Sequence, residues 1–136
     1  MLPSPHLMAP LARAPMEEIQ RQHGLVSGTD AVREILEDLP LVALVVNAQR
    51  QIVYANRAAA TLFAVPAAEL VLGRRFGETV QCVHSRETAA GCGTTEFCVT
   101  CGAATALLAT ETTHAPASRA CRIINRVLGS DLDLRV

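Results

Sequence analysis

The sequence predicts a single α+β domain, and three observations support this prediction. Two β-type runs are joined by a polar turn at residues 47–50, helical periodicity precedes and follows them, and an alternating apolar–polar run lies near the C-terminus. With 136 residues, half of them hydrophobic, the chain can bury one core without disulfide bonds. We therefore expect one domain with a short tail.

Helices are predicted ahead of the sheet. Residues 1–15 are rich in proline and alanine and predict a flexible leader. Residues 16–38 predict a helical extension, with a first helix in MEEIQRQHG and an amphipathic helix in TDAVREILEDLP that Asp30 caps and Pro40 ends. Apolar residues share one face of the second helix: Val32, Ile35, Leu36 and Leu39. Because this face must be covered, we expect it to pack on the domain or on a second copy in a homodimer.

Residues 39–136 predict the domain itself. LVALVVNAQRQIVYAN predicts a hairpin, RAAATLFA and PAAELVLGRRF predict short helices, and TTEFCVTCGAATALLATET predicts one longer helix. The run ASRACRIINRV alternates, with Cys121, Ile123, Asn125 and Val127 on one face and Arg122 and Arg126 on the other. It predicts a half-buried strand, and LDLRV begins another after a turn at LGSD. Since the chain stops there, we expect the sheet to lack a last strand.

The composition excludes several classes of function. The net charge is −1 and acidic and basic residues are interspersed, which is not the pattern of a nucleic-acid-binding surface. All twelve basic residues are arginine, and without lysine neither Schiff-base chemistry nor a P-loop is possible. No Ser–His–Asp set, paired-carboxylate site or phosphate loop is recognisable, so we do not expect this segment to be an enzyme.

The sequence also predicts where the protein resides. No apolar run approaches the roughly 18 residues that a membrane helix needs. The N-terminal segment contains four prolines and no continuous apolar core, so it is not a secretory signal. We therefore expect a cytoplasmic protein, in which clustered cysteines are metal ligands or redox-active thiols rather than structural disulfides.

Three of the five cysteines lie in the stretch GCGTTEFCVTCG, and the full spacing is C-x9-C-x5-C-x2-C-x19-C. Cys98 and Cys101, at i and i+3 of a helical turn, are expected to point to one side, where the helix dipole favours thiolates. Cys92 lies between Gly91 and Gly93, which permit a tight loop that returns its sulfur to that turn. Several thiolates converging on one ion or cluster are what a metal site needs.

Two further cysteines are candidates for the fourth ligand. Cys121 is predicted on the inward face of its strand, and Cys82 lies just upstream of the loop. His84 is a weaker substitute for either. The spacing C-x5-C-x2-C with a distant cysteine also resembles the ligand pattern of adrenodoxin-type [2Fe–2S] ferredoxins, although nothing else in the chain resembles a ferredoxin.

The stretch LPLVALVVNAQRQIVYANRAAATLFAVPAAELVLGRRFGE, from Leu39 to Glu78, resembles the N-terminal half of a PAS sensory domain. The resemblance extends more weakly to residue 136. It implies a PAS-like five-stranded antiparallel sheet with helices on one face, which enclose a ligand or cofactor cavity. It also implies that Asn56 is a structural cap at a strand–helix corner. The family's role is sensing, often as the input module of a histidine kinase, a cyclic-dinucleotide enzyme or a transcription factor.

Four interpretations of the cysteines stay open. An iron–sulfur cluster is favoured because a sensory fold needs a group that responds to a signal. The second interpretation is structural zinc in an interaction or dimerisation module, and the third is a Cys98–Cys101 thiol–disulfide switch. The fourth is a small-molecule-binding PAS domain whose cysteines are incidental. Certain oxygen-sensing PAS domains carry a four-cysteine cluster on two C-x-x-C pairs, whereas this chain has one such pair. With a cluster, its oxidation or loss is expected to free the Cys92 loop and shift the Cys121 strand, which signals to an output domain.

Overall fold

The computed structural model describes residues 7–125 and 129–136. These residues form two compact units, one of Ala12–Thr79 and one of the described residues up to Leu11 together with Val80–Val136. Residues 1–6 of the predicted leader, and Arg126 and Val127 of the predicted strand, lie outside the described residues. None of the helices in the described part of the chain is long and apolar enough to cross a membrane.

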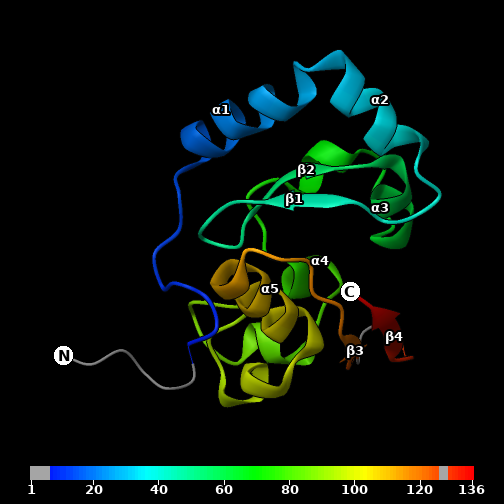
Figure 1. Ribbon diagram of the computed structural model, residues 1–136. Helices are drawn as coiled ribbons and strands as arrows, with labels where there is room; N and C mark the ends of the chain where they lie inside the picture. The colour runs from blue at the N-terminus through cyan, green and yellow to red at the C-terminus, as the bar shows by residue number, and fades with distance from the viewer. Residues whose placement is uncertain (1–6, 126–128) are drawn as a thin grey trace. The chain divides into compact units, whose positions relative to one another are not determined.

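The unit Ala12–Thr79 is a β-hairpin surrounded by helices (Figure 1). Its elements in chain order are α1 (Met16–Ser27), α2 (Asp30–Asp38), β1 (Leu44–Val46), β2 (Ile52–Ala55), α3 (Arg57–Leu62), the 3-10 helix η1 (Ala68–Val71) and α4 (Phe76–Thr79). β1 and β2 pair antiparallel around the polar turn, where the Asn47 side chain accepts the N–H groups of Gln49 and Gln51. The hairpin predicted from the sequence is therefore present.

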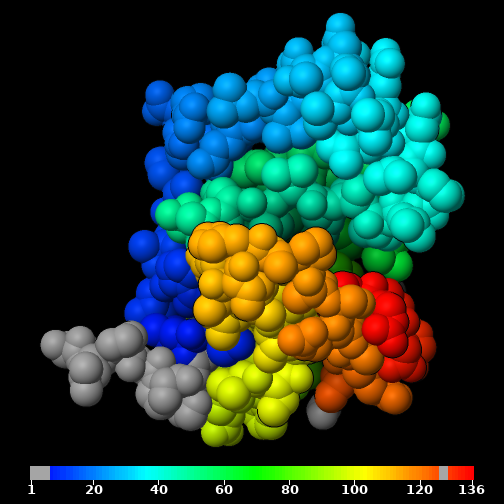
Figure 2. All heavy atoms as spheres, in the orientation of Figure 1, coloured from blue at the N-terminus to red at the C-terminus, as the bar shows by residue number. Residues whose placement is uncertain are grey.

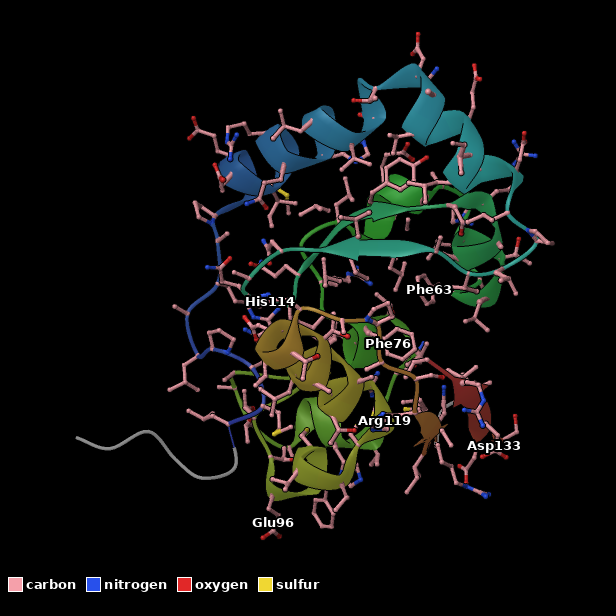
Figure 3. The ribbon with its side chains drawn as sticks, in the orientation of Figure 1. Phe63, Phe76, Glu96, His114, Arg119 and Asp133 are labelled. Atoms are coloured by element: carbon pink, nitrogen blue, oxygen red, sulfur yellow. The ribbon has the colours of Figure 1, made fainter. Side chains whose placement is uncertain are left out.

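The core of this unit lies between α1, β2 and the short helices. All four residues of β2 are buried, as its apolar run requires, and Ile19 of α1 is fully buried. His23 Nδ1 lies 2.8 Å from the carbonyl oxygen of Val53, which ties α1 to β2. The rings of Phe63 and Phe76 are tilted by 59° with centroids 6.3 Å apart (Figure 3). The histidine contact thus holds α1 on the hairpin, and the phenylalanine contact joins the end of α3 to α4.

α2 leaves much of its apolar face open. Ile35 is 64 % exposed and Val32 is 43 % exposed, and no residue of α2 is buried. In the space-filling view the helix lies at the surface (Figure 2). The face that the sequence predicts to be covered is therefore accessible in this chain taken alone.

The second unit carries the cysteines. Its elements are the 3-10 helices η2 (Val83–Arg86) and η3 (Glu96–Thr100), then α5 (Gly102–Thr113), β3 (Ala120–Ile123) and β4 (Leu132–Arg135). β3 and β4 pair antiparallel, with Ala120 opposite Arg135 and Ile123 opposite Leu132. Burial along β3 alternates, with Cys121 and Ile123 inside. This alternation agrees with the predicted half-buried strand.

The five-stranded sheet expected from the family resemblance is not observed. The described residues form two separate two-stranded sheets, β1–β2 and β3–β4, of strands three or four residues long. Between α4 and α5 the chain folds into 3-10 turns and glycine turns, so this stretch offers no strand to join the two hairpins. The predicted α+β class agrees with the structure, whereas the predicted five-stranded sheet does not.

The single long helix predicted over TTEFCVTCGAATALLATET is also wrong, because it divides into η3 and α5. Cys101, between them, has extended backbone angles of φ −67° and ψ 127°. Gly102 lies so close to β3 that a Cβ there would stand 1.9 Å from the Ala120 carbonyl oxygen. The break therefore lets the start of α5 press its backbone against β3.

Candidate metal centre

Sulfur atoms from two distant parts of the sequence meet where α5 begins. Cys101 Sγ and Cys121 Sγ lie 3.9 Å apart, although the two residues are 20 positions apart in the chain. Gly102 makes this approach possible, because its missing Cβ leaves room for the backbone of β3. A tertiary contact, not the local C-x-x-C spacing, thus brings these two thiols together.

At 3.9 Å the two thiols form a weak S–H···S hydrogen bond, and the same separation is compatible with metal ligation. Two sulfurs bound to one tetrahedral ion at about 2.3 Å lie about 3.8 Å from each other. Disulfide-bonded sulfurs are about 2.05 Å apart, much closer than the 3.9 Å observed. Cys101 and Cys121 therefore fit as two neighbouring ligands of a tetrahedral metal site.

The surroundings of Cys121 favour a neutral thiol unless a cation is present. Burial raises the pKa of Cys121 to about 11, and the neighbouring Cys101 sulfur also raises it. The backbone N–H groups of Ala103 and Gly102 act in the opposite direction, since they hydrogen-bond to the sulfur and favour the thiolate. A bound cation would supply the missing positive charge and deprotonate the thiol.

Cys82 has a similar environment in the same unit. Burial raises its pKa, while backbone N–H groups of His84 and Ser85 hydrogen-bond to the sulfur and lower it. Negative charge on Cys101 and on Cys98 raises the pKa of Cys82 further, so both sulfurs lie within electrostatic reach of Cys82.

Cys98 lies in a 3-10 turn and not in the α-helical turn that the i, i+3 spacing predicts. The residue is 6 % exposed, and its Sγ lies 3.3 Å from the Oγ1 of Thr95, which immediately precedes η3. The 3-10 turn and the extended Cys101 replace the α-helical geometry on which the i, i+3 argument depends. Cys98 is thus near the pair, with its thiol engaged locally.

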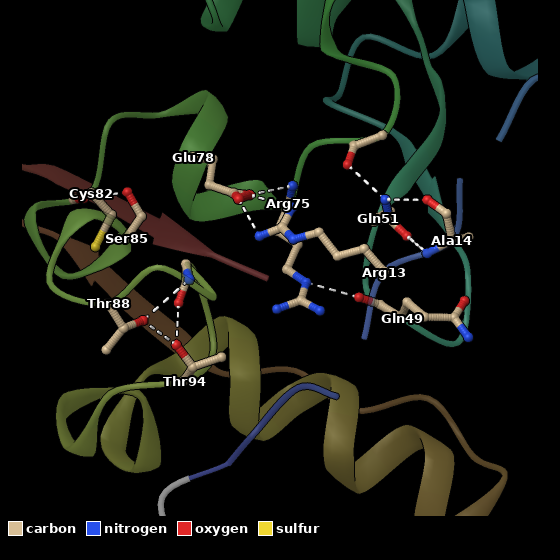
Figure 4. Close-up of polar contacts among 12 residues, drawn as sticks. Arg13, Ala14, Gln49, Gln51, Arg75, Glu78, Cys82, Ser85, Thr88 and Thr94 are labelled. Carbon is tan, nitrogen blue, oxygen red and sulfur yellow. Dashed lines mark hydrogen bonds and ion pairs between the residues drawn. The ribbon is translucent and has the colours of Figure 1, made fainter. Parts of the chain in front are cut away.

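Cys92 lies half-buried in a loop whose conformation depends on glycine. Gly91 and Gly93, on either side, have φ values of +86° and +90°. Thr94 Oγ1 donates to the Gly91 carbonyl and is also bonded to Thr88 Oγ1, which closes the loop (Figure 4). The tight loop predicted around Cys92 is therefore present.

The loop also binds a segment that sequence reasoning missed. The Gly93 carbonyl accepts the N–H groups of Met8 at 2.8 Å and of Ala9 at 3.1 Å, and Ala9 is buried. A Cβ on Gly93 would lie 2.6 Å from the Ala9 Cβ, so only glycine fits this approach. The proline- and alanine-rich composition of residues 1–15 does not predict this contact with Gly93.

One ring nitrogen of His84 is already engaged by another side chain. Its Nδ1 lies 2.9 Å from Glu87 Oε1, and its ring stacks on Phe97 with centroids 4.3 Å apart. His84, in η2, is thus engaged by Glu87 and Phe97 of its own unit.

The sulfurs do not form a complete ligand set. Within residues 7–125 and 129–136, no group of three or more histidine, cysteine, aspartate or glutamate side chains is arranged to hold a metal ion. The separation of Cys101 Sγ and Cys121 Sγ is one that two ligands of a single ion would have. The residues therefore fit a sulfur-ligated metal in part.

A second polar cluster lies in the unit Ala12–Thr79 (Figure 4). Gln51, which is buried, accepts the Ala14 N–H at 2.7 Å and donates to the Gly73 carbonyl at 3.0 Å. Arg75, 1 % exposed, donates from Nε to the Gln49 carbonyl at 2.8 Å. This buried structural role of Arg75 was not predicted from the sequence.

Asn56 has the role that the family resemblance implies. It is the N-cap of α3, and its side chain accepts the N–H of Ala59 at 3.0 Å. The family model of the PAS fold matches residues 30–90, a little under half of the chain. The match shows that this segment is similar to the PAS fold.

The segment that matches the PAS fold contains one of the five cysteines. It spans the hairpin, Asn56 and Cys82, and it ends just before Cys92. No curated protein and no solved structure significantly matches the chain. PAS domains are generally sensory rather than catalytic, and they commonly dimerise and link to output domains. The PAS segment thus carries the sensory assignment, and the sulfur pair lies beyond it in sequence.

Proposed function

We propose that this chain is the sensory module of a cytoplasmic signalling protein and that its cysteines hold a redox-responsive metal centre. The PAS match supports the sensory role. The observation that carries the metal centre is the 3.9 Å separation of Cys101 Sγ and Cys121 Sγ, the spacing of two ligands on one tetrahedral ion.

The remaining ligands come from the same unit. Cys101 and Cys98 lie within electrostatic reach of Cys82, and Cys92 lies in a glycine-flanked loop of the same unit. An iron–sulfur cluster, when bound, supplies a centre that changes oxidation state, whereas zinc supplies stability alone. We favour the cluster because a sensory module needs a group that responds to its surroundings.

The protein supplies the polar environment of the thiolates. N–H groups of Gly102 and Ala103 hydrogen-bond to the Cys121 sulfur, and those of His84 and Ser85 hydrogen-bond to the Cys82 sulfur. These donors stabilise negative sulfur inside a buried site, and in iron–sulfur proteins such hydrogen bonds help to set the redox potential.

A change of ligation would reach two elements directly. Cys121 is part of β3, which pairs with β4, and Cys92 is part of the loop whose Gly93 carbonyl holds Met8 and Ala9. Loss of thiolate ligation would free both and so alter the ends of the chain segment that we expect to contact an output domain, such as a histidine kinase. We assign the open apolar face of α2, with Val32 and Ile35, to a homodimer contact.

Anaerobic purification followed by metal analysis and a visible absorption spectrum tests the proposal. Iron and acid-labile sulfide in stoichiometric amounts, with a charge-transfer band that oxygen bleaches, are the expected result. Stoichiometric zinc in a colourless protein would overturn the redox form and leave a zinc-stabilised interaction module, because zinc also fits the sulfur spacing. Protein without metal would overturn both and favour a PAS domain that binds a small molecule and has incidental cysteines.

A further inference from the structure

We propose that Cys101 and Cys121 are an oxidisable thiol pair that closes to a disulfide when the site has lost its metal. As regulation of the metal centre the inference rests on the proposed function, while the bond itself is a property of these two residues. The sequence points to a different pair, because C-x-x-C motifs at helix starts are the usual dithiol switches. The structure assigns the bond to a contact between α5 and β3 instead.

The distances favour this pairing. Cys101 Sγ lies 3.9 Å from Cys121 Sγ, whereas Cys98 Sγ lies 3.3 Å from Thr95 Oγ1. To pair with Cys101, Cys98 must leave that hydroxyl and its 6 % exposed position. The Cys101–Cys121 pair needs only an approach of about 2 Å to reach bonding distance.

The backbone around the pair already supports a short bridge. A Cβ on Gly102 would stand 2.9 Å from the Cys121 Cα, so the two chains are in contact beside the sulfurs. We expect rotation about the Cα–Cβ bonds of Cys101 and Cys121 to bring the sulfurs together. A disulfide also needs the backbones of its two cysteines to be close, which this junction provides.

The difference in exposure gives the two thiols different roles. Cys101 is half-buried and Cys121 is 3 % exposed, so a small oxidant such as hydrogen peroxide meets Cys101 first. Peroxide converts the Cys101 thiol to a sulfenic acid and releases one water. The Cys121 sulfur then attacks the Cys101 sulfur, the S–S bond forms, the S–O bond breaks, and the thiol proton leaves with the hydroxide as a second water. One peroxide and two thiols thus give one disulfide and two waters.

The consequence is a lock on the metal site. The same two sulfurs that stand at ligand spacing are consumed by the bond, so the oxidised protein cannot hold the metal through them. The disulfide also fixes the start of α5 to β3, the junction that Gly102 already packs.

Trypsin can cleave this chain only after arginine, and these cleavages separate Cys121 from the other cysteines. Cys82 falls in residues 76–86, Cys92, Cys98 and Cys101 fall in residues 87–119, and Cys121 falls alone in residues 120–122. Full-length protein, both as purified and after treatment with a chelator, is exposed to equimolar hydrogen peroxide. Remaining thiols are then alkylated, and the protein is digested without reductant and analysed by mass spectrometry.

The expected product joins residues 120–122 to residues 87–119 with the loss of two hydrogens, and fragmentation places the bond on Cys101. Cys98→Ser is the matched control and keeps this product, whereas Cys101→Ser loses it. If Cys101→Ser does not fold, fragmentation of the wild-type and Cys98→Ser products still locates the bond. An internal Cys98–Cys101 bond, with Cys121 alkylated, would overturn the inference.

The result also separates this inference from the metal proposal. Metal-loaded protein is expected to form the joined peptide only as the metal is lost. Metal-free protein from anaerobic cells that still forms the Cys101–Cys121 bond would overturn the metal centre and leave the thiol pair standing. Bound metal together with a bond at another residue would overturn the thiol pair alone.

Discussion

Asn56 fixes the corner between β2 and α3 with one side chain. Its Oδ1 accepts the N–H groups of Ala43 and Ala59, and its Nδ2 donates to the carbonyls of Leu36 and Leu41, at 2.8–3.0 Å. The residue is fully buried, so no water can replace these bonds from outside. The amide is therefore used completely, as a donor twice and as an acceptor twice.

We expect Asn56→Ala to lower the free energy of unfolding by about 2–4 kcal/mol, because it removes a helix cap and leaves buried polar groups unpaired. Urea unfolding followed by circular dichroism measures the change. Thr61→Ala, an exposed position in the same helix, is the control and should cost less than about 0.5 kcal/mol. Asn56→Asp keeps the acceptor and loses both donors, so wild-type stability in that variant would contradict the account.

Tyr54 reports on the packing of α2 against β2. Its hydroxyl donates to Glu37 Oε1 at 2.6 Å, and burial together with this carboxylate raises the pKa of Tyr54 to about 12. The folded state holds the phenol proton more strongly than the unfolded state, whose pKa is about 10. The resulting stabilisation is present below pH 10 and is lost as the pH rises from about 10 to about 12.

Tyr54 is the only tyrosine and the chain has no tryptophan, so the ultraviolet absorbance of the phenolate titrates this residue alone. The folded protein is expected to titrate near pH 12. Glu37→Gln removes the carboxylate and should lower the pKa, although not to about 10, because burial is the larger cause. A wild-type midpoint near 10 in protein that is still folded would contradict the contact.

At the scale of elements, the cysteine loop and the chain segment at Met8 and Ala9 behave as one packed feature. Gly93 has a φ of +90°, and a Cβ there would lie 2.6 Å from the Ala9 Cβ. Gly129 has a φ of +75° with nothing within 4 Å of a Cβ. Alanine at either site introduces backbone strain of roughly 1–3 kcal/mol, but only Gly93→Ala also displaces Ala9.

We expect Gly93→Ala to speed hydrogen exchange at the Met8 and Ala9 amides about tenfold or more, since both donate to the Gly93 carbonyl. Gly129→Ala should leave these two amides unchanged. Exchange measured by mass spectrometry or NMR distinguishes the variants. Equal protection of the two amides in wild type and Gly93→Ala would show that the segment is not held by the loop.

Local patterns predicted some elements well. The polar turn at residues 47–50 placed the hairpin, and the alternation around Cys121 placed β3, because both signals depend on neighbours in the sequence. The continuous helix around Cys98 and Cys101 was wrong because its interruption arises from a tertiary contact. Gly102 packs closely against Ala120, and the residues next to Gly102 in the sequence do not indicate this contact.

At the scale of the whole molecule, the sequence predicted the class and family but not the sheet. Residues 30–90 match the PAS fold as expected, while the described strands remain in two separate pairs. The cysteines were selected by type and spacing, yet which sulfurs meet depends on how α5 lies against β3. Cys121 was therefore a candidate from the sequence, and its pairing with Cys101 required the structure.

The most direct test of the metal centre is the metal-to-protein ratio of anaerobically prepared wild type compared with Cys101→Ser and Cys121→Ser. The account predicts a stoichiometric ratio in wild type and a large loss in both variants, with circular dichroism to confirm that each is folded. Wild type without bound metal, or folded variants that retain all of it, would contradict the assignment of this sulfur pair as ligands.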